Sequence, residues 1–189
     1  EIIPKTINIE KEIFISETKI NLYRKMNRMN TIESRKSLLS NEDVKLNILT
    51  ALKSAVYMFY RFLHNNQREL NSEINSAIYY FIRNFSYSSM FRYNSKGQFN
   101  VPYGGMGYNK NNLTNKIRYL ESTQLKERLD NTTIENLDFF DFFNRKKLNK
   151  TDFIFLDPPY DTKFSTYDNN SFELEDQKRL ANLLINQIT

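Results

Sequence analysis

Residues 157–160, Asp-Pro-Pro-Tyr, place a carboxylate, two stiff rings and an aromatic side chain in direct succession. Proline holds its own φ at about −65° and restrains the residue before it, so Asp157 and Tyr160 are expected to be fixed in position. An aromatic ring can stack on a flat substrate while carboxylate and carbonyl oxygens accept its N–H groups. The tetrapeptide is therefore a candidate site for chemistry on a planar substrate that carries an amine. The alternative is a strand that ends in a Pro-rich turn without a chemical role.

The apolar run at 153–156, Phe-Ile-Phe-Leu, must position this tetrapeptide. A short apolar run bounded by proline is typical of a buried strand in a parallel sheet. Open α/β sheets bind their ligands at the carboxyl ends of such strands. A further strand is expected over residues 132–137. These segments predict an α/β fold in which Asp157 lies at a strand tip beside a cleft.

Several other segments have helical patterns. Ser40, followed three residues later by Asp43, is typical of a helix start, and the apolar stripe that follows predicts a helix to about Leu63. Further helices are expected over residues 72–85, 114–129 and 139–148, and from Ser171 to about residue 188. The one histidine, His64, falls at a helix end and is interpreted as solvent-exposed.

The composition is that of a globular protein. Of the 189 residues, 40% are hydrophobic and 26% are charged, which argues against wholesale disorder. The net charge of +5 favours a polyanionic partner. Cysteine is absent, which excludes disulfides and thiolate zinc sites, and no metal site is expected. Neither a signal peptide nor an apolar run of ~18 residues is visible, so we expect a cytoplasmic protein without membrane association.

Residues 86–112 differ in character from the rest of the chain. They are rich in Ser, Asn, Tyr and Gly, and all four glycines of the chain fall between Gly97 and Gly107. Residues 95–97, Ser-Lys-Gly, are a turn signal, and residues 99–101 alternate as in a strand. We expect a hairpin or a long exposed loop that presents Arg92.

The segment from Arg92 to Gly104 reads Arg-Tyr-Asn-Ser-Lys-Gly-Gln-Phe-Asn-Val-Pro-Tyr-Gly. Together with the Asp-Pro-Pro-Tyr motif, it resembles the Dam-type (D12 class) DNA adenine-N6 methyltransferases. In that family, an Arg-Tyr-Asn and Phe-Asn-Val-Pro hairpin precedes a catalytic Asp-Pro-Pro-Tyr. Residues 136–139, Asn-Leu-Asp-Phe, and segments within 164–172 resemble further parts of the family. The resemblance extends over about residues 79–185.

The resemblance implies a fold and a division of the chain. The expected fold is part of a Rossmann-like, S-adenosylmethionine-dependent methyltransferase sheet, joined to a helical and hairpin target-recognition region. Residues 1–39 have no assigned role. Residues 40–130 would form the target-recognition region, with the DNA-reading hairpin near 86–112, and residues 131–189 would form part of the catalytic domain.

The resemblance also implies an activity. The chain would take part in site-specific transfer of a methyl group from S-adenosylmethionine to adenine N6 in double-stranded DNA, with the adenine flipped out of the duplex. Such activity serves restriction–modification or bacterial and phage DNA methylation, and a cognate restriction endonuclease is the expected partner. The implied catalytic residues are Asp157, Pro158, Pro159 and Tyr160. Tyr160 would stack on the base, while the Asp157 carboxylate and the Pro158 carbonyl would accept the N6–H bonds. The implied cofactor contacts are Asp138, Phe139 and Asp157.

The implied DNA-binding residues lie in or near the hairpin. They are Tyr87, Ser88, Met90, Arg92, Asn94, Lys96, Asn100, Pro102 and Lys110. Arg92 is expected to read the O6 and N7 edge of a guanine, and Pro102 to touch a thymine methyl. Tyr87 would wedge into the gap that the flipped base leaves. Lys96, Lys110 and Lys116 would contact phosphates or would be solvated surface charges.

Two departures from the family pattern limit these expectations. Members that read GATC have Tyr-Asn-Gly-Leu where this chain has Tyr87-Ser88-Ser89-Met90, so the recognition sequence stays open. The family's Phe-x-Gly-Gly cofactor loop is not found, because no glycine precedes Gly97. The remaining strands of the family sheet are also not found after Tyr160. The chain is therefore expected to be a middle piece of a larger enzyme.

Two alternatives stay open. The chain could be a truncated, catalytically inactive DNA-binding fragment. Relatives with Asn-Pro-Pro-Tyr or Ser-Pro-Pro-Tyr motifs modify glutamine or cytosine N4, but the Asp at 157 and the hairpin motif favour adenine.

Overall fold

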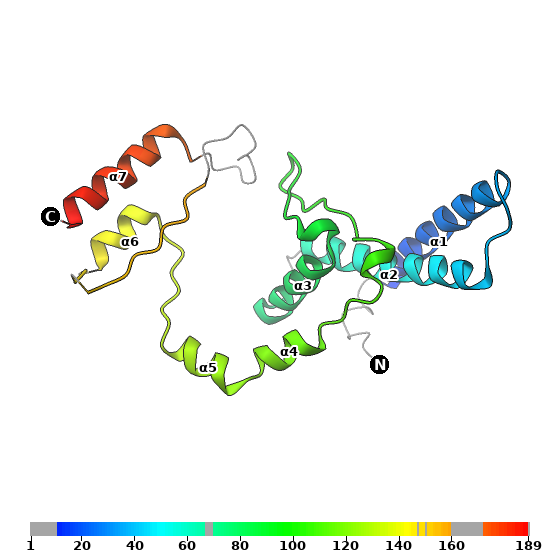
Figure 1. Cartoon of the computed structure of the whole chain (residues 1–189), viewed down its shortest axis with the longest axis horizontal. Coiled ribbons are helices and arrows are strands. Elements are labelled where there is room, and N and C mark those ends of the chain that lie inside the picture. The colour runs from blue at the N-terminus through cyan, green and yellow to red at the C-terminus, as the bar shows by residue number, and fades with distance from the viewer. Residues whose placement is uncertain (1–10, 67–69, 147, 150, 160–171, 189) are drawn as a thin grey trace. The chain divides into compact units, whose positions relative to one another are not determined.

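The computed structural model describes residues 11–66, 70–146, 148–149, 151–159 and 172–188 (Figure 1). The chain divides into two compact units, Glu1–Asn111 and Asn112–Thr189. Each unit has its own helices and its own buried side chains.

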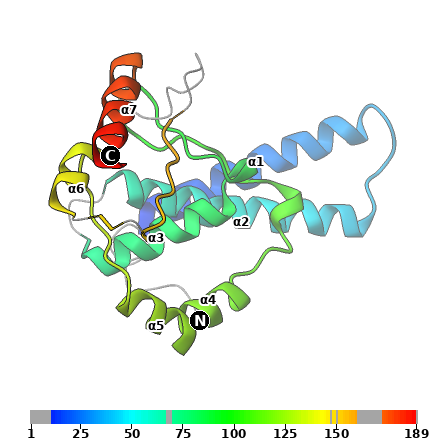
Figure 2. The same ribbon diagram turned by 60° about the vertical axis from the view of Figure 1, so that its left-hand side comes forward.

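Three long helices form the body of the first unit. They are α1 (Lys11–Glu33), α2 (Asn41–Asn65) and α3 (Ser72–Phe85), and α2 packs against both α1 and α3 (Figures 1 and 2). The helix expected after Ser40 is confirmed, because the Ser40 hydroxyl accepts a hydrogen bond of 3.1 Å from the Asp43 N–H. Asn71 caps α3 in the same way, through the Ile74 N–H at 2.9 Å. The first helix lies within the segment for which the sequence suggested no structure.

The core of the first unit lies where α2 and α3 meet the segment after them. Its apolar members are Ala51, Ala55, Tyr57, Phe59 and Leu63 of α2, Ile78, Ile82 and Phe85 of α3, and Phe99, Val101 and Tyr103. Burial of one such large side chain stabilises a fold by about 1.5–3 kcal/mol. The burial of Phe99, Val101 and Tyr103 therefore attaches residues 99–103 firmly to the helices.

His64 belongs to this core, and the expectation that it is solvent-exposed is wrong. Its side chain is only 9% exposed, and its ring lies near those of Tyr79 and Phe99, with centroids 6.1 and 6.0 Å away. Asn65 and Asn66, which follow His64, are polar and favoured a solvent-exposed helix end. Phe99, which is 35 positions later in the chain, nevertheless packs against the His64 ring at this end of α2.

The described part of the second unit contains four helices: α4 (Thr114–Leu120), α5 (Thr123–Asp130), α6 (Phe139–Arg145) and α7 (Leu174–Ile188). The single helix expected over 114–129 is divided, because the Ser122 hydroxyl accepts a bond of 3.2 Å from the Leu125 N–H and begins a new helix there. The helix α6 ends three residues earlier than expected. It packs against α7, with Phe143, Leu180 and Leu183 buried.

The expected α/β fold is wrong, because the described residues are mainly helical and contain no strand. Two isolated antiparallel bridges, Ser86 with Tyr103 and Tyr93 with Phe99, are the only sheet-like pairings in this part of the chain. Residues 153–156 have no paired neighbour within the described ranges, and Phe153 and Phe155 are 89% and 78% exposed. Apolar patterning predicts an extended backbone, but a strand also needs a hydrogen-bonded partner. The expected Rossmann-like sheet and the strand at 132–137 are therefore corrected to helices joined by irregular segments.

Two absences apply to the described residues alone. None of their helices combines the length and the apolar character that crossing a lipid bilayer requires. In the same ranges, no group of three or more His, Asp or Glu side chains could hold a metal ion.

Candidate functional site

Residues 92–104 form a narrow irregular hairpin on the surface of the first unit. The Asn94 N–H donates to the Gln98 carbonyl at 2.8 Å, and the Asn100 N–H donates to the Arg92 carbonyl at 3.1 Å. Gly97 closes the turn with φ of 71°, a conformation that favours glycine. We call residues 86–109 the recognition segment, since they contain this hairpin and both of its attachments to the helices.

Side chains alternate along the second half of the hairpin. Phe99, Val101 and Tyr103 are buried, Asn100 is partly exposed and Pro102 is exposed. This is the alternation of an extended backbone with one face against the helices. The structure thus brings two of the predicted DNA-binding residues, Asn100 and Pro102, to the solvent side.

Arg92 and Asn100 form a pair across the hairpin. The Arg92 Nε donates to the Asn100 Oδ1 at 3.1 Å, and the Arg92 side chain is exposed. This bond restrains the guanidinium through Nε. Bidentate contact with a base edge can then use the two terminal nitrogens.

Helix α2 holds the inner edge of the hairpin with three side chains. Asn65 accepts from the Phe99 N–H at 2.8 Å and donates to the Phe99 carbonyl at 3.0 Å. Tyr57 and Arg61 both donate to the Val101 carbonyl, at 2.9 and 3.2 Å. Burial raises the pKa of the Tyr57 phenol above its ordinary value, so the hydroxyl stays protonated and remains a donor. We call Tyr57, Arg61 and Asn65 the α2 clamp.

A buried polar network holds the other end of the recognition segment, beside the 3-10 helix η4 (Met106–Tyr108). The Tyr103 hydroxyl donates to Asn109 Oδ1 at 3.1 Å, and Asn109 Nδ2 donates to the Thr50 hydroxyl at 2.7 Å. Lys53 also donates to the Asn109 carbonyl. Buried polar groups that are fully paired in this way specify one arrangement of the segment.

The start of the recognition segment contains the residues at which the chain departs from the GATC-type pattern. Tyr87–Ser89 form the 3-10 helix η3, and both Ser88 and Ser89 have φ of 52°. Serine adopts this left-handed conformation at a cost, whereas asparagine and glycine adopt it readily. Tyr87 is 52% exposed and its N–H donates to the Pro102 carbonyl at 2.9 Å. Met90 is half-buried, and its carbonyl accepts from the Ser86 hydroxyl at 3.2 Å.

The remaining predicted DNA-binding residues differ in their surroundings. Asn94 is occupied within the turn, because its Oδ1 accepts from the Lys96 and Gln98 N–H groups at 2.9 and 3.0 Å. Lys96 and Lys110 are exposed at turns of the same unit. Lys116 lies on α4 of the second unit.

Asp157, Pro158 and Pro159 line a pocket of about 520 Å³ in the second unit. The opposite wall comes from α7 and the residues before it, including Phe172, Leu180 and Leu184. Asp157 is exposed and does not lie on a helix. A carboxylate thus lies beside an apolar wall, a combination found in ligand sites of this size. Tyr160 and the resembling residues at 164–171 lie outside the described residues.

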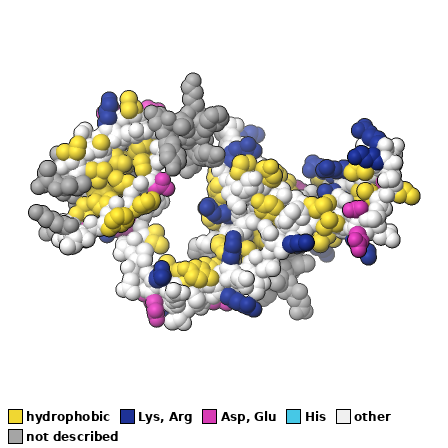
Figure 3. Space-filling model, in the orientation of Figure 1, with side chains coloured by type: hydrophobic (Ala, Val, Ile, Leu, Met, Phe, Trp, Pro, Cys, Tyr) yellow, Lys and Arg dark blue, Asp and Glu magenta, His cyan; other side chains and the backbone are white. Residues whose placement is uncertain are grey.

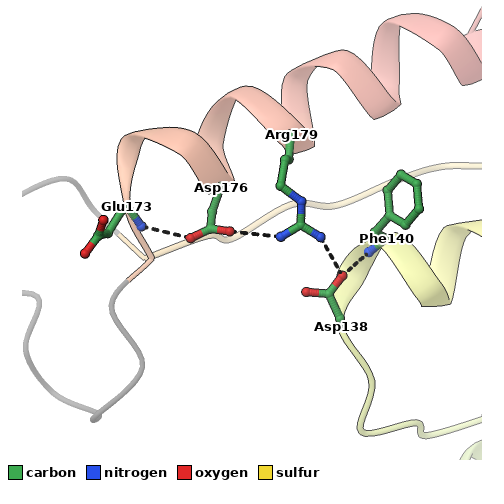
Figure 4. Close-up of polar contacts among 5 residues, drawn as sticks. All are labelled: Asp138, Phe140, Glu173, Asp176 and Arg179. Atoms are coloured by element: carbon green, nitrogen blue, oxygen red, sulfur yellow. Dashed lines mark hydrogen bonds and ion pairs between the residues drawn. The ribbon is translucent and has the colours of Figure 1, made fainter.

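Asp138 caps α6 and connects it to α7 (Figure 4). Its Oδ1 accepts from the Phe140 N–H at 2.9 Å and from the Arg179 guanidinium at 3.3 Å. Arg179 also donates to Asp176 at 3.0 Å, and Asp176 accepts from the Glu173 N–H at 3.2 Å. Each exposed ion pair contributes at most about 1 kcal/mol, but together they orient the Asp138 carboxylate.

Phe139 links this network to the Asp157 pocket. Its ring lies 6.0 Å from that of Phe172, which lines the pocket. The Arg179 guanidinium lies 5.0 Å from the Phe139 ring centroid. Two predicted cofactor contacts therefore lie close to the pocket without lining it. Phe139 contacts Phe172, which lines the pocket, and Asp138 contacts Arg179, which precedes the lining residue Leu180.

Sequence reasoning missed the residues that support these sites. These residues contact partners that are 34 to 59 positions away in the chain. They are Arg179, the three residues of the α2 clamp, and Asn109. The asparagine pair at 65–66 was visible as a pair, but no local pattern reveals its distant partner. Only the tertiary structure shows which of these distant residues pair with one another.

Comparisons with known proteins agree on one family. The sequence profile of the D12 class N6 adenine-specific DNA methyltransferases matches residues 15–187. The type II methyltransferase M.CviBI of Paramecium bursaria Chlorella virus NC1A is 30% identical over 148 residues, which cover 71% of this chain and 53% of the relative. The retron Ec67 DNA adenine methylase of Escherichia coli is 27% identical over 165 residues, which cover 87% of this chain and 53% of the relative.

A third relative, the DNA adenine methylase of Haemophilus influenzae, is 29% identical over 119 residues, or 57% of this chain and 37% of the relative. No solved structure shows a significant match. The chain spans about half the length of the first two relatives. Because the family profile matches nearly the whole chain, including both motifs described above, the chain belongs to the D12 class N6 adenine-specific DNA methyltransferase family.

Proposed function

We propose that this chain provides the target-recognition and catalytic segments of a site-specific DNA adenine-N6 methyltransferase. One observation carries the proposal: within a family match over residues 15–187, Asp157, Pro158 and Pro159 line a pocket of about 520 Å³. The methyl acceptor would be adenine in double-stranded DNA, flipped out of the stack so that its N6 becomes accessible.

The proposed chemistry relies on hydrogen-bond acceptors rather than on a covalent intermediate. The Asp157 carboxylate and the Pro158 carbonyl accept the two N6–H bonds, which favours a tetrahedral nitrogen with an available lone pair. Pro159 stiffens the backbone between these acceptors and Tyr160, which stacks on the base. Catalysis then comes from positioning and electrostatics.

The methyl donor proposed for this site is S-adenosylmethionine, which supplies an activated methyl group on a sulfonium. The residues of the second unit suit such a group: the Asp157 carboxylate lies beside apolar Leu156, Phe172 and Leu180, and this pairing of negative charge with apolar surface fits a cationic adenosyl compound. Asp138 and Phe139 would contact its adenosine part. The network through Arg179 would keep the Asp138 carboxylate in place.

The proposed DNA contacts come from the recognition segment. Arg92 would read a guanine edge while Asn100 holds its Nε, and Pro102 would touch a thymine methyl. Tyr87 would fill the gap that the flipped base leaves. Ser88, Met90 and Asn94 would support this arrangement, and Lys96 and Lys110 would contact phosphates.

We place the activity in the cytoplasm of a bacterial or virus-infected cell, because the relatives come from bacteria and a virus. A role in restriction–modification, with a cognate endonuclease as partner, is part of the same proposal.

Substitution of Asp157 by alanine tests the proposal. In the enzyme that contains this chain, Asp157→Ala should abolish methyl transfer to duplex DNA, while the dissociation constant for DNA stays within a few-fold of wild type. An equal loss of both would make Asp157 a structural residue. Asp152→Ala, which removes an exposed carboxylate outside the pocket, is the matched control.

Calorimetric titration separates methyl transfer from the competing function. Binding of both S-adenosylmethionine and duplex DNA supports the methyltransferase. Binding of DNA with no binding of S-adenosylmethionine would instead favour an inactive DNA-binding fragment.

A further inference from the structure

A second pocket, of about 330 Å³, lies in the first unit between α1, α2 and the recognition segment. Its lining includes four cationic side chains: Arg24, Lys25 and Arg28 of α1 and Arg61 of α2. Pro102, Tyr103 and Gly105 form the part of the wall that belongs to the recognition segment. Lys and Arg side chains are visible over the α1 part of the molecule in the space-filling view (Figure 3).

No carboxylate of the described residues forms an ion pair with the cations of this pocket. Residues 24, 25 and 28 fall on one face of α1 by helical spacing. Among the ion pairs of the described residues, none involves Arg24, Lys25, Arg28 or Arg61. Asn21, which also lines the pocket, donates from its Nδ2 to the Glu17 carboxylate of the same helix at 3.2 Å. Four positive charges therefore share one recess, and the resulting positive potential favours the binding of an anion.

The surroundings of Lys25 are consistent with an excess of positive charge in the recess. Burial, and after it the charge of Arg28, lower the pKa of Lys25 below its ordinary value. Both causes act against the positive charge, and the negative charge of a bound anion would offset them by favouring the charged form of Lys25.

The position of Arg61 links the recess to the hairpin. Arg61 lines the pocket and also donates to the Val101 carbonyl at 3.2 Å. Pro102, the residue after Val101, is exposed and lines the same pocket. An anion in the recess would therefore lie next to Pro102, which is proposed to touch a thymine methyl.

We propose that this recess binds the sugar–phosphate backbone of duplex DNA, with Arg24, Lys25 and Arg28 contacting phosphates beside the base pairs read by the hairpin. The inference rests on the proposed function, and it adds a phosphate-binding surface on α1 and α2. Phosphate contacts of this kind set the register of a protein on DNA without reading sequence. The recess would hold the backbone in place while the hairpin reads bases.

Two triple variants with equal loss of charge test the recess. The recess variant carries Arg24→Gln, Lys25→Gln and Arg28→Gln, and the control carries Lys19→Gln, Lys36→Gln and Lys45→Gln, three exposed lysines outside the recess. Fluorescence anisotropy with a labelled duplex would give dissociation constants between about 50 and 200 mM salt. Circular dichroism would verify that both variants fold. Arg24→Gln and Arg28→Gln alone, both at exposed positions, would carry the test if the triple variant unfolds.

The recess variant should lose about 2 to 3 from the slope of log Kd against log salt, since each phosphate contact contributes about 0.9. The loss should be the same for every duplex sequence, and the control should change by less than half as much. Equal losses in both triple variants, a loss at one base pair alone, or no duplex binding by the wild-type chain would each overturn the proposal. Displacement of DNA by inorganic phosphate, relative to chloride at matched ionic strength, would identify a free-anion site instead.

Failure of the recess is distinguishable from failure of the proposed function. Equal losses in the two triple variants, with methyl transfer intact in the enzyme, would remove the recess and leave the methyltransferase. A selective loss of DNA binding in the recess variant, together with no methyl transfer by the wild-type enzyme, would support the recess and contradict the proposed methyltransferase function.

Discussion

Arg92 and Asn100 constrain one another, and this pair determines which nitrogens of the guanidinium stay available for other contacts. Asn100 occupies Nε at 3.1 Å, so the terminal nitrogens are the pair that can address the O6 and N7 atoms of guanine. The sequence predicted that Arg92 contacts the O6 and N7 edge of a guanine. The structure shows Asn100, another predicted DNA-binding residue, bonded to the Arg92 Nε, and we expect this bond to orient the guanidinium.

Arg92→Ala should cost about 1–3 kcal/mol at one base pair and relax the choice of base there. Asn100→Ala should weaken discrimination at the same base pair by a smaller amount, because Arg92 keeps its charge and loses only its orientation. The two losses should be non-additive in the double variant. Binding to duplexes that differ at single positions would measure this, with Lys96→Ala as the control that lowers affinity for all sequences alike. A loss by Arg92→Ala that is uniform over all duplexes would make Arg92 a phosphate contact.

His64 makes the stability of the chain depend on pH near neutrality. Burial lowers the pKa of His64, so the unfolded chain takes up its proton at a higher pH than the folded chain. The stabilisation is therefore present above the ordinary pKa of about 6.5 and is lost as the pH falls through the lower folded value. Because His64 is the only histidine, this pH range reports on one residue.

The urea midpoint of the wild-type chain should decrease between about pH 7.5 and 5.5, whereas that of His64→Gln should change less over the same range. The single histidine resonance in NMR spectra should titrate below about pH 6.5. Parallel pH dependence of the two proteins would contradict this account.

At the scale of elements, α2 is both the centre of the helical core and the support of the hairpin. Its apolar residues face α1 and α3, while Asn65, Arg61 and Tyr57 bind the backbone of Phe99 and Val101. The Asn65 amide pairs with both backbone groups of Phe99, as a neighbouring strand would. One helix thus replaces the missing strand partner of the hairpin.

Asn65→Ala should leave the Phe99 N–H and carbonyl without this partner, at a cost of about 1–3 kcal/mol in unfolding free energy. Hydrogen exchange of the Phe99 amide should accelerate, and discrimination at the base pair read by Arg92 should weaken. Asn66→Ala is the matched control, because Asn66 is exposed and donates to the Phe62 carbonyl of its own helix. If the two variants show equal exchange and equal discrimination, the α2 clamp does not position the hairpin.

At the scale of the whole molecule, the two units differ in how well their apolar residues are covered. Among the described residues, the first unit buries twelve of the fifteen apolar core residues, from Met29 to Tyr103, and the second buries three. Phe153 and Phe155 are among the most exposed aromatic side chains of the second unit. Hydrophobic side chains cover much of the surface over α6 and α7 in Figure 3. Exposed apolar surface of this kind favours self-association.

The double substitution Phe153→Ser and Phe155→Ser should therefore reduce self-association of the isolated chain, measured by light scattering as a function of concentration. Helix content should stay unchanged, because neither residue lies in a helix. Tyr23→Ser, at an exposed position of α1, is the control and should have little effect. Unchanged scattering by the double variant would show that these two side chains do not drive association.

The sequence by itself determined the local features of this protein. Ser40 and Asp43 identified the start of α2, the turn at Gly97 identified the hairpin, and two motifs in fixed order identified the family. Each of these depends on residues close together in the chain or on direct comparison of motifs. Caps, turns and periodic stripes are local, so they can be read without coordinates.

Only the tertiary structure decided what those features contact. The apolar run at 153–156 predicted a strand, yet a strand requires a neighbour, and the described residues offer none. His64 is buried, and Asn65 and Asn109 are bound, because the recognition segment returns to α2 from 34 or more residues away. Burial, pairing and shared pockets depend on which distant segments meet, and this is fixed by the packing of the whole unit rather than by any local pattern.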